Sequence, residues 1–188
     1  QCHNFFTEDP VTWKPGPQGF SRDPLYAPLQ LTPGHVGCQF YADGSDMSPC
    51  TVIKIYGKSK MGAEQIGCSK CHDPHGTDHW ADLTLSVEDN ALCIACHEPY
   101  ATEAAQTAHS RHAADSAGNR CHECHMPRHM RFSNGIHTMS KRIPSHAFSI
   151  PTGEQLPGGP PPSCNVCHVD KDAKWTRKIL KQWREEKR

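Results

Sequence analysis

The spacing of apolar and polar residues predicts a chain of loops and short helices with little sheet. Its clearest element is the C-terminal tail, where Trp175, Ile179 and Trp183 form one apolar stripe at helical spacing. Acidic residues precede this stripe and basic residues follow it, which matches the helix dipole and predicts a helix over residues 170–188. We interpret the stripe as a face that docks on the rest of the chain, with partner binding as the alternative.

Two shorter helices are predicted in the middle of the chain. Residues 86–89 form a capping-box-like signal and predict a short helix that starts there. The Ala-rich stretch 101–114 predicts a second helix, which Gly118 ends. His109 and His112 lie three residues apart in this stretch, so a continuous helix would present both on one side.

A small β-hairpin is predicted near the N-terminal side of the chain. Residues 39–41 and 51–56 are its candidate strands, and the turn signal at residues 42–44 separates them. A disulfide between Cys38 and Cys50 would close the hairpin near its base. On the chain-entropy model, closing so short a loop contributes roughly 3 kcal/mol.

The composition is too polar to build an ordinary apolar core. Hydrophobic residues make up 36% of the 188 residues and aromatic residues 7%, with 14 Gly and 16 Pro. The mean hydropathy is −0.69, a composition close to that of disordered chains. The formal net charge of zero gives no basic footprint for nucleic acid, and no apolar run reaches the length of a membrane span.

Four Cys-x-x-Cys-His motifs change this picture. Zinc ribbons and thioredoxin-like pairs also use Cys-x-x-Cys, but neither requires a His directly after the second Cys. That arrangement is typical of covalent c-type haem, in which both thiols bond to the porphyrin and the His ligates iron. We number them motifs 1 to 4, with residues Cys68, Cys71, His72; Cys93, Cys96, His97; Cys121, Cys124, His125; and Cys164, Cys167, His168.

Four covalently bound haem c groups would supply the missing core. Each macrocycle is a large apolar body pinned by two thioethers and its axial ligands, so we expect no stable fold without haem. We predict one domain over residues 1–188, mostly irregular with short α-helices around the haems. Its parts are a motif-free arm with the hairpin (1–67), a haem-binding region (68–168) and the C-terminal helix (169–188).

The haems also predict the compartment. Covalent haem c is attached outside the cytoplasm, which indicates a secreted or periplasmic protein, and Gln1 resembles a terminus left by processing. An oxidising compartment favours a disulfide between Cys38 and Cys50, which leaves Cys2 as the unpaired third cysteine outside the motifs. Cys2 then pairs across subunits, stays free, replaces a hairpin partner or belongs to a clipped fifth motif.

Ten histidines remain beyond the four in the motifs, and four haems need at most four of them as second axial ligands. An iron with imidazole on both faces has no open position, so it carries electrons and does not bind substrate. The ten histidines outside the motifs, from which the second axial ligands would come, are His3, His35, His75, His79, His109, His112, His122, His129, His137 and His146.

Three stretches resemble segments of multihaem cytochromes with doubled haem motifs, the superfamily that includes cytochrome c nitrite reductases and their electron-carrier relatives. The stretches are CHDPHG at 71–76, the segment from His109 to Pro127 and the segment from Ser145 to Trp175. Within that superfamily the chain resembles the tetrahaem extracellular cytochromes that form filaments. This resemblance implies haems stacked in alternating parallel and T-shaped pairs, and a homopolymer in which a His of one subunit ligates a haem of the next.

The resemblance also implies which histidines are distal ligands. His75 and His146 match the pattern, one of His109 and His112 is the third, with His112 favoured, and His35 is the fourth. His3 is the candidate for donation to a neighbouring subunit and an alternative to His35.

The function indicated is electron transfer by a polymerising extracellular cytochrome, with redox proteins or extracellular acceptors as partners. A soluble periplasmic shuttle with the same haems is one alternative. A haem reductase of small nitrogen or sulfur compounds is another. The catalytic Cys-x-x-Cys-Lys motif of nitrite reductases is absent from this sequence, so we predict that the protein is not an enzyme.

Overall fold

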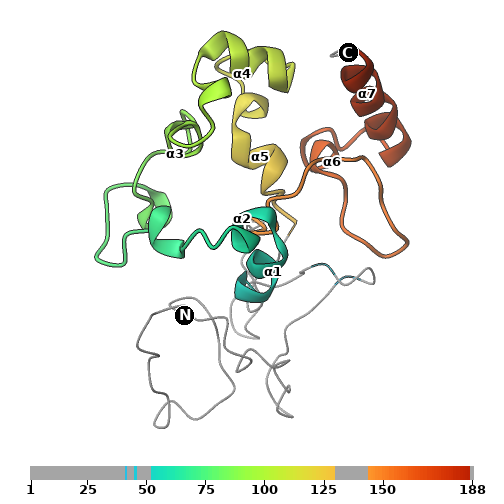
Figure 1. Cartoon of the computed structure of the whole chain (residues 1–188). Helices are drawn as coiled ribbons and strands as arrows, with labels where there is room; N and C mark the ends of the chain where they lie inside the picture. Colours follow the sequence, from blue (N-terminus) through green and yellow to red (C-terminus); the bar gives the residue numbers. More distant parts are fainter. Residues whose placement is uncertain (1–40, 42–44, 46–51, 130–143, 187–188) are drawn as a thin grey trace, which may run out of the picture.

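The structure, a computed structural model, describes residues 41, 45, 52–129 and 144–186 (Figure 1). Its α-helices are α1 (Val52–Lys58), α2 (Lys60–Ala63), α3 (Ala91–Ile94), α4 (Glu103–Ser110), α5 (Cys121–His125), α6 (Ser163–Cys167) and α7 (Ala173–Glu185). Short 3-10 turns lie between them at η3 (Cys68–Lys70), η4 (Trp80–Asp82), η5 (Glu98–Tyr100) and η6 (Ala117–Asn119). The expected architecture of loops and short helices is confirmed for these residues.

The predicted hairpin is not seen. Within the described ranges there is no β-strand, only one isolated antiparallel bridge between His72 and Leu83. The expected second strand, residues 51–56, overlaps helix α1, where two of its apolar residues find tertiary environments: Ile55 is buried, and the Tyr56 ring lies edge-on to Phe148. Cys2, Cys38 and Cys50 lie outside the described residues, so the disulfide stays a prediction.

Two helix boundaries also differ from expectation. The chain turns through residues 86–90, and α3 begins only after Asn90, which has φ +65°. Helix α4 ends at Ser110, and Arg111 has φ +59°, well before Gly118. His109 therefore lies on the helix and His112 beyond it, so the two do not share one helix face.

Helix α7 confirms the prediction for the tail. The Asp172 carboxylate caps its start by accepting a hydrogen bond of 2.8 Å from the Trp175 N–H. Thr176 and Leu180 are buried along the inner face. Gly153 lies directly under this helix, since a Cβ there would come within 2.6 Å of the Arg177 backbone nitrogen. Trp175, Ile179 and Trp183 of the predicted stripe are only half-buried, so the face that packs most closely is centred on Thr176 and Leu180, beside the stripe.

Apolar burial is sparse for a folded chain. Among the described residues, the buried hydrophobic side chains are Ile55, Leu83, Val87 and Leu180. The buried polar side chains are more numerous: Ser59, Asn90, Asn119, His122, His129, Ser145 and Thr176. Four apolar side chains cannot offset the conformational entropy of the residues that the structure describes, so other interactions have to stabilise this part of the chain.

Two asparagine networks, one buried around Asn90 and one half-buried around Asn165, join neighbouring parts of the chain. Asn90 accepts a hydrogen bond of 2.8 Å from the Cys121 N–H and donates to the Asn119 carbonyl at 3.0 Å and the Gln106 side chain at 2.8 Å. Asn165 donates to the Lys171 carbonyl at 2.8 Å and accepts from the Thr176 hydroxyl at 2.7 Å. The first network ties motif 2 to motif 3, and the second ties motif 4 to α7.

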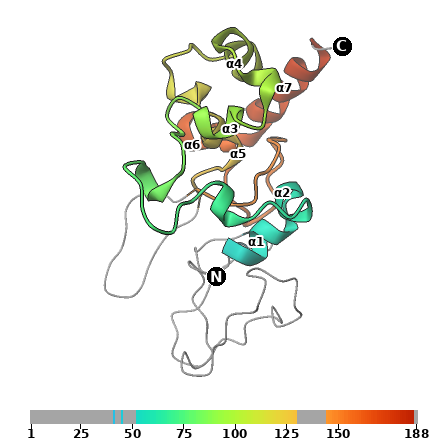
Figure 2. The same ribbon diagram turned by 60° about the vertical axis from the view of Figure 1, so that its left-hand side comes forward.

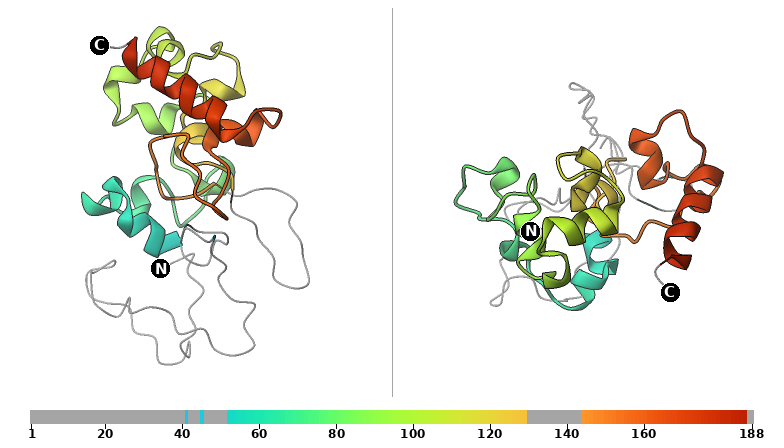
Figure 3. Two further views of the ribbon diagram at one scale, coloured as in Figure 1. Left: turned by 90° about the vertical axis from the view of Figure 1, so that its right-hand side faces the viewer. Right: turned by 90° about the horizontal axis from the view of Figure 1, so that it is seen from above.

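The helices follow one another through space in chain order. Figure 1 shows α1 and α2 at one end, α3 and α4 on one flank, α5 centrally, and α6 and α7 on the other flank. The turned views in Figures 2 and 3 show the C-terminal end of α7 near α4, where Arg111 and Glu186 form a 2.8 Å ion pair. Each described helix is too short or too polar to cross a bilayer.

Replacing Asn90 by Ala should destabilise the haem-loaded protein. The change removes three hydrogen bonds and leaves the Cys121 N–H without its acceptor. We expect a loss of about 2–3 kcal/mol in the free energy of unfolding, measured by guanidinium denaturation. The exposed Gln155→Ala variant is the control and should change stability by less than about 0.5 kcal/mol. Equal stabilities of the two variants would contradict the role given to Asn90.

Candidate haem sites

Each motif folds as a helical turn. The N–H of the motif histidine donates to the carbonyl of the first motif cysteine at 2.9 Å in motif 1, 3.0 Å in motif 2 and 2.8 Å in motif 4, and motif 3 is helix α5 itself. Residues i, i+3 and i+4 of such a turn lie on one face, so both thiols and the imidazole point the same way. None of the eight motif cysteines is in a disulfide.

Thiols of consecutive motifs are neighbours. Cys93 and Cys121 share a hydrogen bond, which raises the pKa of Cys93 and lowers that of Cys121 to about 7. Burial, and then the nearby Cys96, raise the pKa of Cys71. Burial raises the pKa of Cys124 to about 11, with the charges of Cys164 and Cys167 adding to it. The attachment sites therefore adjoin in the order of the chain, from motif 1 through motif 4.

Three of the four motif imidazoles face a second imidazole. His72 of motif 1 lies opposite His146, with ring centres 6.3 Å apart and ring planes 25° apart. His125 of motif 3 lies opposite His109, at 6.1 Å and 15°. His168 of motif 4 lies opposite His112, at 6.2 Å and 40°.

The common separation fits an iron between the rings. A metal–imidazole bond of about 2.0–2.1 Å, with each ring centre ~1.1 Å behind its nitrogen, places two opposed ring centres about 6.3 Å apart. Aromatic pairs in direct contact span a wide range of about 4.5–7 Å. Three independent pairs within 6.1–6.3 Å, each with a motif histidine, fit axial coordination better than ordinary ring packing.

Zinc has no comparable arrangement in the described part of the chain. A tetrahedral zinc site needs four protein donors gathered at one point. Among these residues, no group of three or more His, Cys, Asp or Glu side chains is placed to hold a metal ion.

Backbone carbonyls fix three of the imidazoles. The Nδ1 of His72 lies 2.9 Å from the Ala81 carbonyl, that of His112 lies 2.7 Å from the Ser110 carbonyl, and that of His125 lies 3.0 Å from the Ser149 carbonyl. A carbonyl only accepts, so each Nδ1 carries the proton and each Nε2 keeps its lone pair. This is the tautomer that an Nε2-ligated iron requires.

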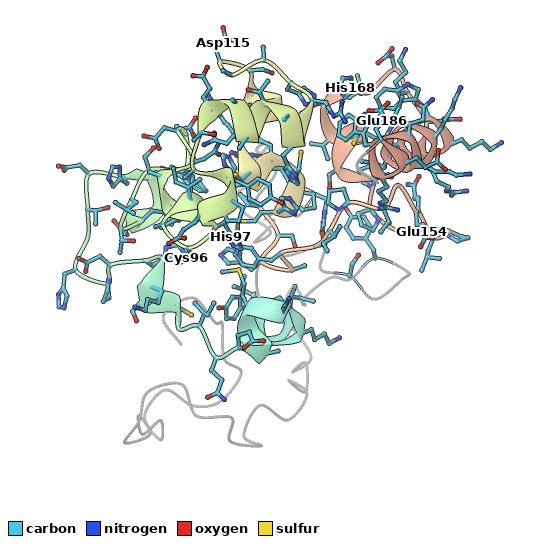
Figure 4. All side chains as sticks on the ribbon, turned by 45° about the horizontal axis from the view of Figure 1, so that its top comes forward. Cys96, His97, Asp115, Glu154, His168 and Glu186 are labelled. Atoms are coloured by element: carbon cyan, nitrogen blue, oxygen red, sulfur yellow. The ribbon has the colours of Figure 1, made fainter. Side chains whose placement is uncertain are left out.

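Three aromatic residues and one glycine pack next to the paired imidazoles. The Phe148 ring lies edge-on to His146 at 6.0 Å, Tyr100 lies 4.6 Å from His109 and Trp175 lies 5.1 Å from His168. His168 lies beside α7 in Figure 4. Gly118 lies against the His112 ring, because a Cβ at this position would overlap ring atoms, the Cγ at 2.6 Å among them. Each of these residues lies within nine positions of the histidine that it contacts, yet no motif or periodicity in the sequence marks Tyr100 or Phe148 as a ring contact.

Not every expected ligand takes such a position. His97 of motif 2 is exposed, and within the described residues no imidazole faces it; Figure 4 labels it beside Cys96. His75 is also exposed, and it is not opposed to a motif histidine in the described part of the chain. Where the sequence favoured one of His109 and His112, the structure brings both against motif rings. His3, His35 and His137 lie outside the described residues.

Two other buried histidines have different neighbours. His122 interacts through Nε2 with the Arg128 guanidinium and the Glu123 carboxylate, each 3.1 Å away. The hydrogen bond from His122, together with Arg128, lowers the pKa of Glu123. His129 lies edge-on to Tyr41, with ring centres 5.8 Å apart.

The comparison with protein families agrees with the geometry. A family model described as the doubled CXXCH motif matches residues 61–102, which contain motifs 1 and 2. No curated protein and no solved structure matches the chain. At the level of class, the match supports a multihaem c-type cytochrome with covalently bound haem c. Membership of this class would indicate a role in electron transfer, and cytochromes of this class generally lie outside the cytoplasm.

Replacing Gly118 by Ala should disturb the His112 ring. The added Cβ has to displace this imidazole or the backbone beside it, which costs about 1–3 kcal/mol of unfolding free energy. Gly57→Ala is a matched control, since nothing lies within 4 Å of the added Cβ there. Guanidinium denaturation of both haem-loaded variants measures the difference, and a Gly118→Ala protein as stable as Gly57→Ala would refute the close packing.

Proposed function

We propose that this chain is a secreted tetrahaem c-type cytochrome that carries electrons and polymerises into a conductive extracellular filament. The repeated opposition of a motif imidazole by a second imidazole, at 6.1–6.3 Å, is the observation that carries the proposal of electron transfer. Two imidazoles saturate an iron, which favours electron transfer over substrate binding.

The ring pairs suggest an axial ligand set for three haems, numbered as their motifs. Haem 1 would be held by His72 and His146, haem 3 by His125 and His109, and haem 4 by His168 and His112. When bound, haem c supplies one-electron redox chemistry, and the protein contributes spacing, ligation and burial.

The neighbouring thiols suggest the route that electrons take. Attachment sites that adjoin in chain order hold their macrocycles in the same order. We propose that electrons pass from haem to haem along this series. Haems 1 and 4 are then its two ends within a subunit.

Replacing His146 by Ala should convert haem 1 alone to high spin. Loss of one axial imidazole leaves its iron with a single strong ligand, so about one quarter of the ferric haem should change spin state in the EPR and absorption spectra. His129→Ala, whose ring faces Tyr41, and the exposed His79→Ala should leave all iron low spin. A fully low-spin His146→Ala protein would remove His146 from the ligand set.

The second axial ligand of haem 2 would link two subunits of the filament. We propose that His3 of a neighbouring subunit completes this site opposite His97, as the resemblance to filament-forming cytochromes implies. His35 and His75 are the alternatives from within the same chain. An iron ligated across the subunit boundary would couple assembly directly to a complete set of low-spin haems.

His3→Ala should therefore abolish filaments and produce one high-spin haem in the same preparation. Electron microscopy and EPR of the native and variant proteins measure the two effects. His35→Ala and His75→Ala are the matched comparisons and should retain filaments. If either of these gives the high-spin signal, the ligand comes from the same chain, and native protein that stays monomeric at high concentration would favour the soluble periplasmic shuttle.

One observation favours a second candidate function. The exposed His97 has no facing imidazole among the described residues, as an iron with an open position would require. Such an iron would bind small nitrogen compounds and reduce them. A high-spin ferric signal in the native protein, together with a spectral change on adding nitrite or hydroxylamine, would support this reductase.

A further inference from the structure

Left-handed backbone is concentrated beside the carbonyls that hold the imidazoles. A non-glycine residue with φ near +60° is strained and persists where its surroundings impose this conformation. The described residues with this conformation are Gln65, Ala81, Asp82, Asn90, Arg111 and Phe148. Four of them, Ala81, Asp82, Arg111 and Phe148, lie at or next to the acceptors Ala81, Ser110 and Ser149.

The geometry of the peptide unit explains why this placement matters. The direction of a carbonyl is set by the ψ of its own residue and the φ of the next. For the Ala81 carbonyl these are ψ +31° at Ala81 and φ +54° at Asp82, both in the left-handed region. For the Ser110 carbonyl the second angle is φ +59° at Arg111. Phe148, with φ +45°, acts one peptide unit before Ser149.

Some of these conformations have an ordinary explanation. Arg111 ends α4, and a left-handed residue is a common way to end a helix. Gln65 follows the end of α2, and Asn90 precedes α3. Ala81 and Asp82 have no such role, since both lie in an exposed loop where two consecutive left-handed residues reverse the chain.

The loop of residues 73–83 is built to hold this reversal in place. The Asp73 N–H donates to the Asp82 carbonyl at 2.8 Å, and the Thr77 hydroxyl donates to the Leu83 carbonyl at 2.8 Å. The Thr84 N–H closes the base of the loop by donating to the Cys71 carbonyl at 2.9 Å. Leu83 is buried, so the loop is anchored at its end while the Ala81 side chain remains exposed.

We propose that Ala81 and Asp82 form a positioning element for haem 1, which directs the Ala81 carbonyl at the Nδ1–H of His72 through their left-handed backbone. A hydrogen bond at Nδ1 fixes the ring orientation and raises the basicity of the ligating nitrogen. A more basic ligand stabilises ferric iron, so this element lowers the reduction potential of haem 1. The inference rests on the proposed function, in which His72 ligates iron.

A pair of substitutions at Ala81 separates backbone conformation from side-chain contact. Gly adopts the left-handed region without strain, whereas β-branched Val strongly disfavours it, and both replace an exposed side chain. In spectroelectrochemical titration of the haem-loaded protein, Ala81→Gly should keep all four potentials, and Ala81→Val should raise one of them while every haem stays low spin. Ala101→Val is the control at an exposed residue with φ −69° and should shift none.

The outcomes distinguish this inference from the proposed function. A native protein without low-spin haem c would overturn the proposed function itself. Low-spin spectra with unchanged potentials in Ala81→Val, or equal shifts in Ala81→Gly and Ala81→Val, would overturn the positioning role alone. If Ala81→Val yields no haem-loaded protein, Asp82→Gly and Asp82→Ala decide the question, since both remove the carboxylate and only Ala disfavours the left-handed φ. A shift confined to Asp82→Ala supports the proposal, and equal potentials contradict it.

Discussion

Pairs of imidazoles, at a separation that would fit one metal ion between them, are the feature on which the proposed haem sites depend. Each such pair joins separate chain segments: His146 reaches motif 1, His109 reaches motif 3 and His112 reaches motif 4. With four buried hydrophobic side chains among the described residues, burial alone cannot hold these segments together. Metal coordination at such points would add folding free energy that the polypeptide lacks, as in small metal-dependent domains.

Polar contacts then fix what coordination alone leaves free. An axial bond still allows the imidazole to rotate, and the carbonyls of Ala81, Ser110 and Ser149 restrict that rotation by binding Nδ1. The Asn90 network performs a similar task between motifs, because it holds Cys121 of motif 3 beside the start of α3. Buried hydrogen bonds of this kind specify a unique arrangement where apolar packing is too sparse to do so.

The sequence predicted the features that depend on local spacing. The four motifs and helix α7 were evident because covalent chemistry and dipole-matched capping require adjacent residues. The strand expected over residues 51–56 was wrong because the helix buries Ile55 and brings the Tyr56 ring against Phe148, a residue far away in the sequence. The shared helix face of His109 and His112 failed for a related reason: Arg111 ends α4 between them and sends each ring to a different motif. Which histidine faces which motif depends on contacts between residues 16 to 74 positions apart, and no local pattern records them.

The pairing of His72 with His146 also has a consequence for biogenesis. A chain that emerges from its amino end presents motif 1 first, yet the facing imidazole of that motif arrives only after motifs 2 and 3 are already out. His109, by contrast, lies shortly before motif 3 in the sequence, so it has already emerged when His125 emerges. Closing the longer loop is entropically slower. With the proposed ligand pair of His72 and His146, completion of the first motif's site would therefore wait for the Ser145–Phe148 segment to emerge.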